Sequence, residues 1–218
     1  MYSRRQIYMR DVPGLYLYPD VFTKDEENSI ITDINDDRNK NVCTQIHIAT
    51  EYGWKFLPIT TKTENDYLGE LPNWLQNIWK NFILKLEKID ELVGKCDIPD
   101  HVLVNFYPVS DGCNPHVDDI KFWNNWVVGV SLGSGCNIVF SSKTCEKTYW
   151  IPPRSVYVIT SDARYLWKHE IKFEEKDIFY GDIIQRDSRF SITFRTIHSD
   201  ILSQSVRESV KKNENIKL

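Results

Sequence analysis

Short β-type runs separated by turn residues dominate this chain from residue 100 onward, and they limit the possible folds more than any other feature. The runs cover residues 102–107, 126–132, 137–140, 147–151, 155–160, 165–171 and 190–196. Proline, glycine, serine, aspartate and asparagine separate them. Many short strands with such turn signals are typical of a β-sandwich or a barrel. We therefore expect a β core in the C-terminal half.

The N-terminal half has the pattern of helices. Thr23 and Glu26 have the spacing of a capping box, and isoleucines follow at helical intervals, which predicts a helix over residues 23–36. A longer helix is expected over residues 72–93, which begin at a proline and are followed by a glycine. Its apolar stripe is explained by core packing. Together these patterns predict an α+β fold with helices packed outside the β core.

Composition narrows the class of protein. The 218 residues suit one domain, or one domain with an extension. With 27 basic and 31 acidic residues the net charge is −4, which lacks the basic excess common in nucleic-acid-binding proteins but allows a local basic patch. The five cysteines include no C-x-x-C pair, and no 18-residue apolar run occurs. We expect a reduced intracellular protein, cytoplasmic or nuclear, that does not associate with membranes, and its oligomeric state stays open.

The segment His116-Val117-Asp118 is the first candidate for chemistry. On a strand, residues i and i+2 point to the same face, so the imidazole and the carboxylate would project together. Such a short match is frequent by chance, but His169 lies in another β-type run. Two histidines and one carboxylate form the facial triad that suits Fe(II) and leaves three positions open. A structural zinc site would instead be closed, usually by thiolates.

The run from Arg189 to Arg195 alternates strictly between polar and apolar side chains. Its polar face carries Arg189, Ser191, Thr193 and Arg195. Two arginines on one side of a core strand need anionic partners, and a dicarboxylate offers one at each end. Asn105 and Tyr107 also share a strand face and would suit a carboxylate-binding pocket as hydrogen-bond partners. Plainer interpretations stay open: a solvated strand face for the arginines, and ordinary buried polar residues for Asn105 and Tyr107.

These motifs follow one another in an order that resembles the AlkB family of iron and 2-oxoglutarate dioxygenases. They are Asn105-Phe106-Tyr107, His116-Val117-Asp118, Arg164-Tyr165-Leu166-Trp167-Lys168-His169 and Arg189…Ser191…Thr193-Phe194-Arg195. The resemblance covers roughly residues 15–197 and implies a double-stranded β-helix, or jelly roll, buttressed by N-terminal helices. We expect an extension with helices and a substrate-side segment over residues 1–98, a catalytic core over 99–198 and a polar tail over 199–218.

The resemblance also implies roles for individual residues. The expected metal ligands are His116, Asp118 and His169, and the residues expected to bind 2-oxoglutarate are Asn105, Tyr107, Arg189, Ser191 and Arg195. Arg189, helped by Tyr107, would bind the distal carboxylate, while Arg195 and Asn105 would lie near the iron-chelating end. The family's chemistry uses O2 to convert 2-oxoglutarate into succinate and CO2 while a substrate C–H bond is hydroxylated. A non-catalytic binding module on the same fold and an ordinary β-sandwich interaction domain are the competing interpretations.

The substrate has two competing interpretations, a modified nucleic acid and a basic protein segment such as a histone-like tail. The family implies oxidation of an N-linked alkyl group and favours nucleic acid. Four aromatic residues are candidates for stacking on a base, with core packing as the plainer explanation: Tyr52, Trp54, Phe122 and Trp123. Ile120 is a departure, because members that repair alkylated bases often have an acidic residue at that place. The acidic stretch that follows His169 favours the basic protein segment.

Overall fold

The structure is a computed structural model that describes residues 6–40, 49–56, 61–94, 96 and 98–204. The strands are β1 (Ile7–Tyr8), β2 (Leu15–Tyr18), β3 (Ala49–Gly53), β4 (His101–Tyr107), β5 (Cys113–His116), β6 (Trp126–Gly133), β7 (Cys136–Ser141), β8 (Glu146–Ile151), β9 (Ser155–Thr160), β10 (Lys168–Ile171), β11 (Lys176–Phe179), β12 (Asp182–Gln185) and β13 (Arg189–Arg195). The helices are α1 (Lys24–Lys40), α2 (Asn73–Asn81), α3 (Ile89–Val93) and α4 (Ser161–Tyr165), with 3-10 turns η1 (Glu64–Asp66), η2 (Ile83–Lys85) and η3 (Ser199–Ile201).

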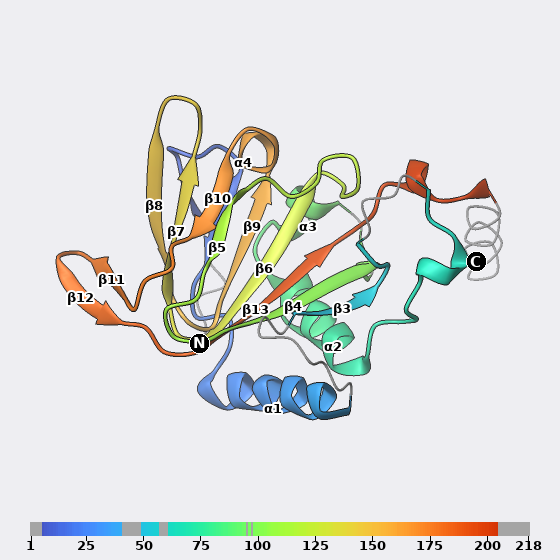
Figure 1. The fold of residues 1–218 in the computed structure, drawn as a ribbon, viewed down its shortest axis with the longest axis horizontal. Coiled ribbons are helices and arrows are strands. Elements are labelled where there is room, and N and C mark those ends of the chain that lie inside the picture. Colours follow the sequence, from blue (N-terminus) through green and yellow to red (C-terminus); the bar gives the residue numbers. More distant parts are fainter. Residues whose placement is uncertain (1–5, 41–48, 57–60, 95, 97, 205–218) are drawn as a thin grey trace.

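Two antiparallel sheets form the β core (Figure 1). The larger sheet has seven strands in the order β1-β2-β9-β6-β13-β4-β3, and the smaller has four in the order β5-β10-β7-β8. Strands β11 and β12 form a separate hairpin. Apolar side chains from both sheets, among them Val127 and Ile159 from the larger and Ile138 and Phe140 from the smaller, pack into one cluster. The sandwich expected from the sequence is therefore present.

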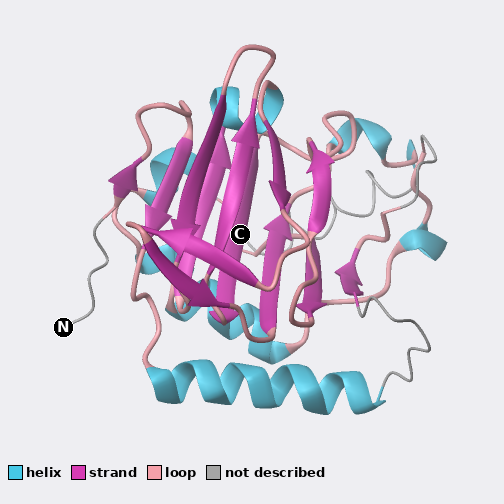
Figure 2. Ribbon diagram, turned by 60° about the vertical axis from the view of Figure 1, so that its left-hand side comes forward, coloured by secondary structure: helices cyan, strands magenta, loops and turns pink. Residues whose placement is uncertain are grey.

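The two faces of the larger sheet differ in character because side chains alternate along each strand. On β13, Phe190, Ile192 and Phe194 enter a large apolar core that also contains buried residues of α1, α2 and α3. The polar side chains of the same strand face the smaller sheet and line a cavity there. Helices thus cover one face of the sheet, as predicted, and leave the other for a site. Figure 2 shows the long helix α1 running across one end of the strands.

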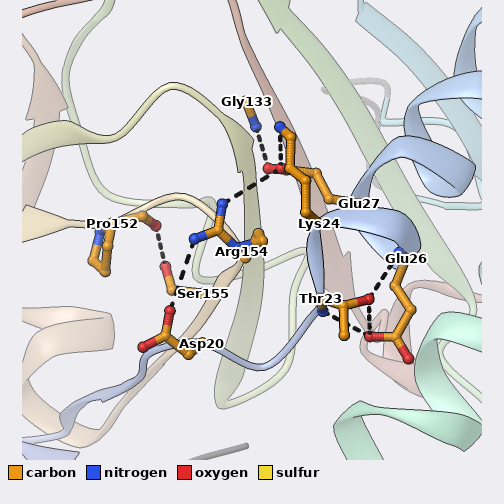
Figure 3. A network of polar contacts seen from close by, with 9 residues as sticks. All are labelled: Asp20, Thr23, Lys24, Glu26, Glu27, Gly133, Pro152, Arg154 and Ser155. Atoms are coloured by element: carbon orange, nitrogen blue, oxygen red, sulfur yellow. Dashed lines mark hydrogen bonds and ion pairs between the residues drawn. The ribbon is translucent and has the colours of Figure 1, made fainter.

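Helix α1 begins with the predicted capping box and is fixed to the sheet by a buried carboxylate (Figure 3). The backbone N–H of Thr23 donates to Glu26 at 2.7 Å, and the backbone N–H of Glu26 donates to the Thr23 hydroxyl at 2.9 Å. The buried Glu27 accepts a hydrogen bond from the Gly133 N–H at 2.8 Å and lies 3.6 Å from Arg154 Nη1. Because Gly133 ends β6, this network sets the position of α1 against the sheet.

The prediction of one continuous helix over residues 72–93 is wrong. Helix α2 ends at Asn81, turn η2 follows, and α3 starts at Ile89. The chain is extended at Leu86, and Lys88 has a φ of 57°, so a continuous helix cannot pass through this point. The break still buries the apolar stripe, because Ile83, Leu86 and Ile89 are all at most 4% exposed. Helical spacing alone could not distinguish these arrangements.

Two further expectations need correction. The strand expected over residues 165–171 starts only at Lys168, because residues 161–165 form α4. The segment over residues 1–98 also contributes more than helices, since β1, β2 and β3 belong to the seven-stranded sheet on either side of the later strands. The sheet therefore crosses the expected boundary at residue 98. Within the ranges that the structure describes, no helix is long and apolar enough to cross a membrane.

Candidate active site

Three expected metal ligands meet where the smaller sheet borders the cavity. His116 is the last residue of β5, and His169 lies directly opposite it on β10. Asp118 follows two residues after the strand, so the loop rather than strand alternation brings its carboxylate in. One ligand atom from each of the three residues lies within 4.8 Å of the others. Asp118 is buried and His116 is exposed, so the site lies inside the protein at Asp118 and is open to solvent at His116.

A backbone carbonyl orients His116 for metal binding. Its Nδ1 lies 2.8 Å from the carbonyl oxygen of Asn114. A carbonyl can only accept, so Nδ1 carries the proton and Nε2 keeps its lone pair. Protein ligands to metals commonly have their second ring nitrogen fixed in this way. His116 is therefore held in the tautomer that a metal requires.

Burial and neighbouring charges set the protonation states of Asp118 and His169, the other two expected ligands. Burial acts to raise the pKa of Asp118, but Arg195, which donates a hydrogen bond to its carboxylate, and the two histidines lower it to about 2. Burial lowers the pKa of His169 to about 4, although Asp118, 3.7 Å away, acts in the opposite direction. At neutral pH the aspartate is ionised and the histidine is neutral. Both groups can then bind a cation without first losing a proton.

Arg164 holds the loop that carries Asp118. This arginine is 1% exposed, and its guanidinium donates to four carbonyl oxygens of the loop. The acceptors and their distances are Asp118 at 2.7 Å, Asp119 at 3.1 Å, Trp123 at 3.1 Å and Asn124 at 3.2 Å. We did not assign this role from the sequence, where Arg164 is only part of the motif before His169. No local pattern reveals it, because the acceptors are 40 to 46 residues away.

The cavity between the sheets has a volume of about 220 Å³ and contains most of the residues expected to bind 2-oxoglutarate. Its walls include all three expected metal ligands together with Asn105, Tyr107, Ser191, Thr193 and Arg195. Arg189 borders an adjoining hollow with Tyr107, and its guanidinium carbon lies 5.4 Å from the Tyr107 ring centre. The polar face of β13 is buried along its whole length. A solvated strand face is therefore excluded.

Arg189 has the hydrogen-bonding capacity that a carboxylate would fill. Its Nε donates to the Ser131 hydroxyl at 2.9 Å. Its Nη1 and Nη2 are buried and find no hydrogen-bond partner among the described residues. A guanidinium with both terminal nitrogens free matches a carboxylate bidentately. A dicarboxylate held here could reach toward the metal ligands, so the residues present fit both Fe(II) and 2-oxoglutarate.

Of the four aromatic residues expected to stack on a substrate, three are buried and Tyr52 is half-buried. The Tyr52 hydroxyl donates to Asp37 of α1, and its ring packs against Trp74, so it belongs to the helix-covered face. Trp54, Phe122 and Trp123 form a separate apolar cluster and are 8%, 5% and 2% exposed. Packing against one another covers Trp54, Phe122 and Trp123, and Tyr52 is half-buried against Trp74, so the four do not form one exposed stacking surface. The Trp123 ring packs at a tilt against His101, with ring centroids 4.2 Å apart, and the Arg195 guanidinium carbon lies over it, 5.2 Å from its centroid.

An exposed ring on the Phe122 and Trp123 side of this cluster is that of Phe56, which the sequence did not single out. It is 41% exposed, and its centroid lies 5.1 Å from that of Phe122 and 5.7 Å from that of Trp123. Phe56 belongs to the aromatic segment Tyr52-Gly53-Trp54-Lys55-Phe56, which contains two of the expected substrate residues, Tyr52 and Trp54. Which of its rings would remain exposed depends on contacts with the loop after Asp118, and no pattern within the segment shows them.

Comparisons with known proteins agree with this site. Residues 14–195 match the 2OG-Fe(II) oxygenase superfamily. Protein L905 of Acanthamoeba polyphaga mimivirus is 30% identical over 199 residues, covering 86% of this chain and 87% of the viral protein. The alkylated DNA repair protein ALKBH8 homolog of Arabidopsis thaliana is 26% identical over 87% of this chain, which spans 60% of the plant protein.

A solved structure supports the fold. The structure of OsALKBH1 superposes with a TM-score of 0.60 at 16% identity, covering 88% of this chain and 100% of that chain. At this identity the likeness concerns the fold alone, and it confirms the jelly roll expected from the sequence. The motif order predicted the same family as these comparisons. The chain belongs to the 2OG-Fe(II) oxygenase superfamily and is an AlkB-like dioxygenase that depends on Fe(II), 2-oxoglutarate and O2.

Proposed function

We propose that this dioxygenase hydroxylates an N-linked alkyl group on a modified nucleic acid. Bound Fe(II) and 2-oxoglutarate supply the oxidising power: one oxygen atom of O2 enters the substrate C–H bond and the other enters succinate. A carbon hydroxylated beside nitrogen gives a hemiaminal, which releases an aldehyde and leaves the nitrogen dealkylated. The name of the Arabidopsis relative, which describes repair of alkylated DNA, supports this choice of substrate.

The position of the acidic segment is the observation that carries the proposal. The β11–β12 hairpin follows the end of β10, whereas the ligand His169 lies near the start of that strand (Figure 1). Its neighbours Arg186 and Asp187 border the hollow beside Arg189, at the far end of the cavity from the metal. Asp177 is paired with Arg186 through hydrogen bonds of 2.6 and 2.8 Å. The acidic residues in and after the hairpin therefore do not oppose a polyanion at the expected metal site.

The surface next to the metal has the components that an unpaired nucleotide needs. The loop after Asp118 carries Ile120, which is 51% exposed, and the exposed Lys121. Phe56 offers an exposed ring against this loop, with the exposed Lys55 beside it in the chain. Aromatic rings stack on bases of any sequence, and lysines bind phosphate. Such a small aromatic and cationic surface favours a single strand over a duplex.

A product assay tests the proposal directly. The enzyme, Fe(II) and 2-oxoglutarate would be incubated with N-methylated DNA and RNA oligonucleotides and, in parallel, with Lys/Arg-rich peptides, and masses would be followed. We expect mass loss on single-stranded oligonucleotides, with activity falling as salt rises. Phe56→Ala should raise the KM for the oligonucleotide several-fold, while Phe173→Ala, at an exposed phenylalanine ahead of the hairpin, should leave it unchanged. Modified peptides with all oligonucleotides untouched would reject the proposal.

The same assay separates an enzyme from a binding module. Succinate formation from 2-oxoglutarate in the presence of Fe(II) reports turnover even without the true substrate. We expect slow succinate formation by the wild type and none by Asp118→Ala. Succinate formation together with inert oligonucleotides would leave the dioxygenase assignment intact and would reject only the substrate.

A further inference from the structure

Tyr157 occupies the wall of the cavity in an unusual way. It belongs to β9, and its residue partner on the neighbouring strand β6 is Gly129. The side chain is 8% exposed and lines the cavity that also contains the metal ligands. No feature of the sequence singled out either residue.

The tyrosine ring lies directly over the backbone of the neighbouring strand. A Cβ atom built on Gly129 would lie 2.1 Å from Tyr157 Cζ and 2.4 Å from its hydroxyl oxygen. Carbon atoms do not approach so closely, so the tyrosine can lie here only because its neighbour is glycine. The φ of Gly129 is not in the left-handed region, so the glycine is required by space and not by backbone conformation.

The phenol reaches across β6 to the polar face of β13. Gly129 is paired with Thr193 on its other side, and the Tyr157 hydroxyl hydrogen-bonds to the Ser191 side chain. Arg189 is close enough to act electrostatically on the phenol. The tyrosine therefore extends from a strand that carries no metal ligand to the end of the cavity where Arg189 lies.

The neighbours of the phenol make it the feature that limits the space. Ser131 and Ser191 are paired across β6 and β13, and both are small. Gly129, over which the ring lies, and Ser191, to which its hydroxyl bonds, are small as well, so the ring fills space that their side chains leave. Burial raises the pKa of Tyr157, so its hydroxyl keeps its proton at neutral pH and can donate a hydrogen bond.

We propose that Tyr157, lying across Gly129, sets the length of the cosubstrate pocket and helps Arg189 to bind the distal carboxylate. The pocket then accepts a five-carbon 2-oxo dicarboxylate and rejects a six-carbon one. Tyr157 is a specificity-determining residue in this proposal, distinct from the expected helper Tyr107 on β4. The ring provides the steric limit and the hydroxyl provides the hydrogen bond, so the two contributions can be separated by mutation.

Calorimetric binding under Mn(II) tests the proposal without turnover. Affinities for 2-oxoglutarate and for 2-oxoadipate, which is one carbon longer, would be measured for the wild type, Tyr157→Phe, Tyr157→Leu and Gly129→Ala. Tyr157→Phe should weaken 2-oxoglutarate binding roughly three- to tenfold and keep the preference for five carbons. Tyr157→Leu should shift the ratio of the two affinities at least tenfold toward 2-oxoadipate. Gly129→Ala should shift it in the same direction with the tyrosine still present.

A matched variant and a folding check make the outcome decisive. Tyr149→Leu alters a tyrosine of the same apolar cluster that does not line the cavity, and it should leave the affinity ratio unchanged. Mn(II) affinity and the unfolding transition would verify each variant. An unchanged ratio in a folded Tyr157→Leu protein would overturn the proposal. If the larger changes prevent folding, Tyr157→Phe decides. An unchanged 2-oxoglutarate affinity in this variant would show that the hydroxyl does not bind the distal carboxylate and would overturn the proposal.

Discussion

Arg189 and Arg195 lie at the two ends of strand β13 and on the same face of the sheet, yet only one of them has an anionic partner in the protein. Arg195 donates to the Asp118 carboxylate and lies over the Trp123 ring. Arg189 has only a serine hydroxyl at its Nε, and its two terminal nitrogens lack partners in the described part of the chain. The charge of Arg195 is thus compensated within the protein by Asp118. Arg189 has no such compensation and can bind the carboxylate of the cosubstrate.

This difference has an energetic consequence. A buried charge without a partner costs several kcal/mol, whereas a buried pair recovers much of that cost through its mutual attraction. The end of the cavity with Arg189 should therefore be the less stable one before ligand binds. Binding of a dicarboxylate would remove the cost at that end and raise the stability of the whole protein.

The largest expected effect isolates the metal end. His116→Ala removes one of three ligands, so Mn(II) affinity should fall more than a hundredfold, while the free energy of unfolding without metal should change by less than about 1 kcal/mol because His116 is exposed. Titration of Mn(II) followed by electron paramagnetic resonance measures the affinity. His198→Ala is the control, since His198 is not part of the ligand group. Retained Mn(II) affinity in His116→Ala would contradict the ligand assignment.

The next effect tests the two arginines directly. Arg195→Met leaves the buried Asp118 without its main cation, so the protein should lose about 3 kcal/mol in urea unfolding. Arg189→Met removes a charge that has no partner, so the ligand-free protein should be unchanged or more stable by up to about 1 kcal/mol. A loss of stability in Arg195→Met without a loss in Arg189→Met would confirm that only Arg195 is paired in the ligand-free protein. Equal destabilisation by both would mean that Arg189 is also paired in solution.

The same variants should differ in their response to cosubstrate. A bidentate, charge-assisted interaction is worth about 1.5–3 kcal/mol, so Arg189→Met should weaken 2-oxoglutarate binding more than tenfold. The thermal stabilisation of the wild type by 2-oxoglutarate with Mn(II) should then largely disappear. A normal shift in melting temperature for Arg189→Met would place the distal carboxylate elsewhere.

A smaller effect concerns the support of Asp118 from outside the cavity. Arg164→Lys replaces a planar group that reaches four carbonyls by an ammonium with three donors on a flexible stem. We expect about 2 kcal/mol lower stability and roughly tenfold weaker Mn(II) binding, because the loop of the ligand loses its support. Arg186→Lys, at the residue that follows the hairpin, provides the control and should leave Mn(II) affinity unchanged. Unaltered Mn(II) binding by Arg164→Lys would reduce this arginine to a structural role.

The contrast between the arginines also shows what the sequence could predict. Strict alternation from Arg189 to Arg195 correctly predicted a buried strand with two faces, because a period of two leaves no other choice. The sequence could not show that Asp118 neutralises Arg195 and leaves Arg189 free, since that depends on where a separate loop ends. Motif order predicted that His116, Asp118 and His169 come together, although Asp118 reaches the site from a loop and not from a strand.

Tertiary contacts explain the expectations that failed. Trp123 is aromatic and follows Asp118 closely in the chain, so it was expected to contact a substrate, but His101 and Arg195 from two other strands bury its ring. Tyr52 is likewise drawn to the helix-covered face by Asp37. The acidic segment after His169 lies near that ligand in the chain but turns away with the hairpin. In each case a partner distant in sequence decides the outcome, which no local pattern contains.

The smallest expected effect compares two carboxyl groups near the end of β13, the buried Asp118 and the half-buried Asp100. Asp118 has a guanidinium partner and a pKa of about 2, whereas burial raises the pKa of Asp100 to about 7, with only partial relief from the hydrogen bond donated by the Ile197 N–H at 2.9 Å. Between pH 4 and 7 the folded protein keeps the Asp100 proton that the unfolded chain has released. The contribution of Asp100 to stability must therefore fall as pH rises through this range.

Asp100→Asn turns this comparison into a measurement, because asparagine keeps an oxygen that can accept from the Ile197 N–H but cannot ionise. The variant should be more stable than the wild type at pH 8 by about 1–2 kcal/mol, and the gain should vanish as pH approaches 4. Urea unfolding at pH 5 and pH 8 gives the two differences, and contributions from the metal ligands cancel between variant and wild type. A gain that stays constant with pH would show that Asp100 does not titrate in this range. A loss at pH 8 would show that its charged form is stabilised, as that of Asp118 is, by a cation.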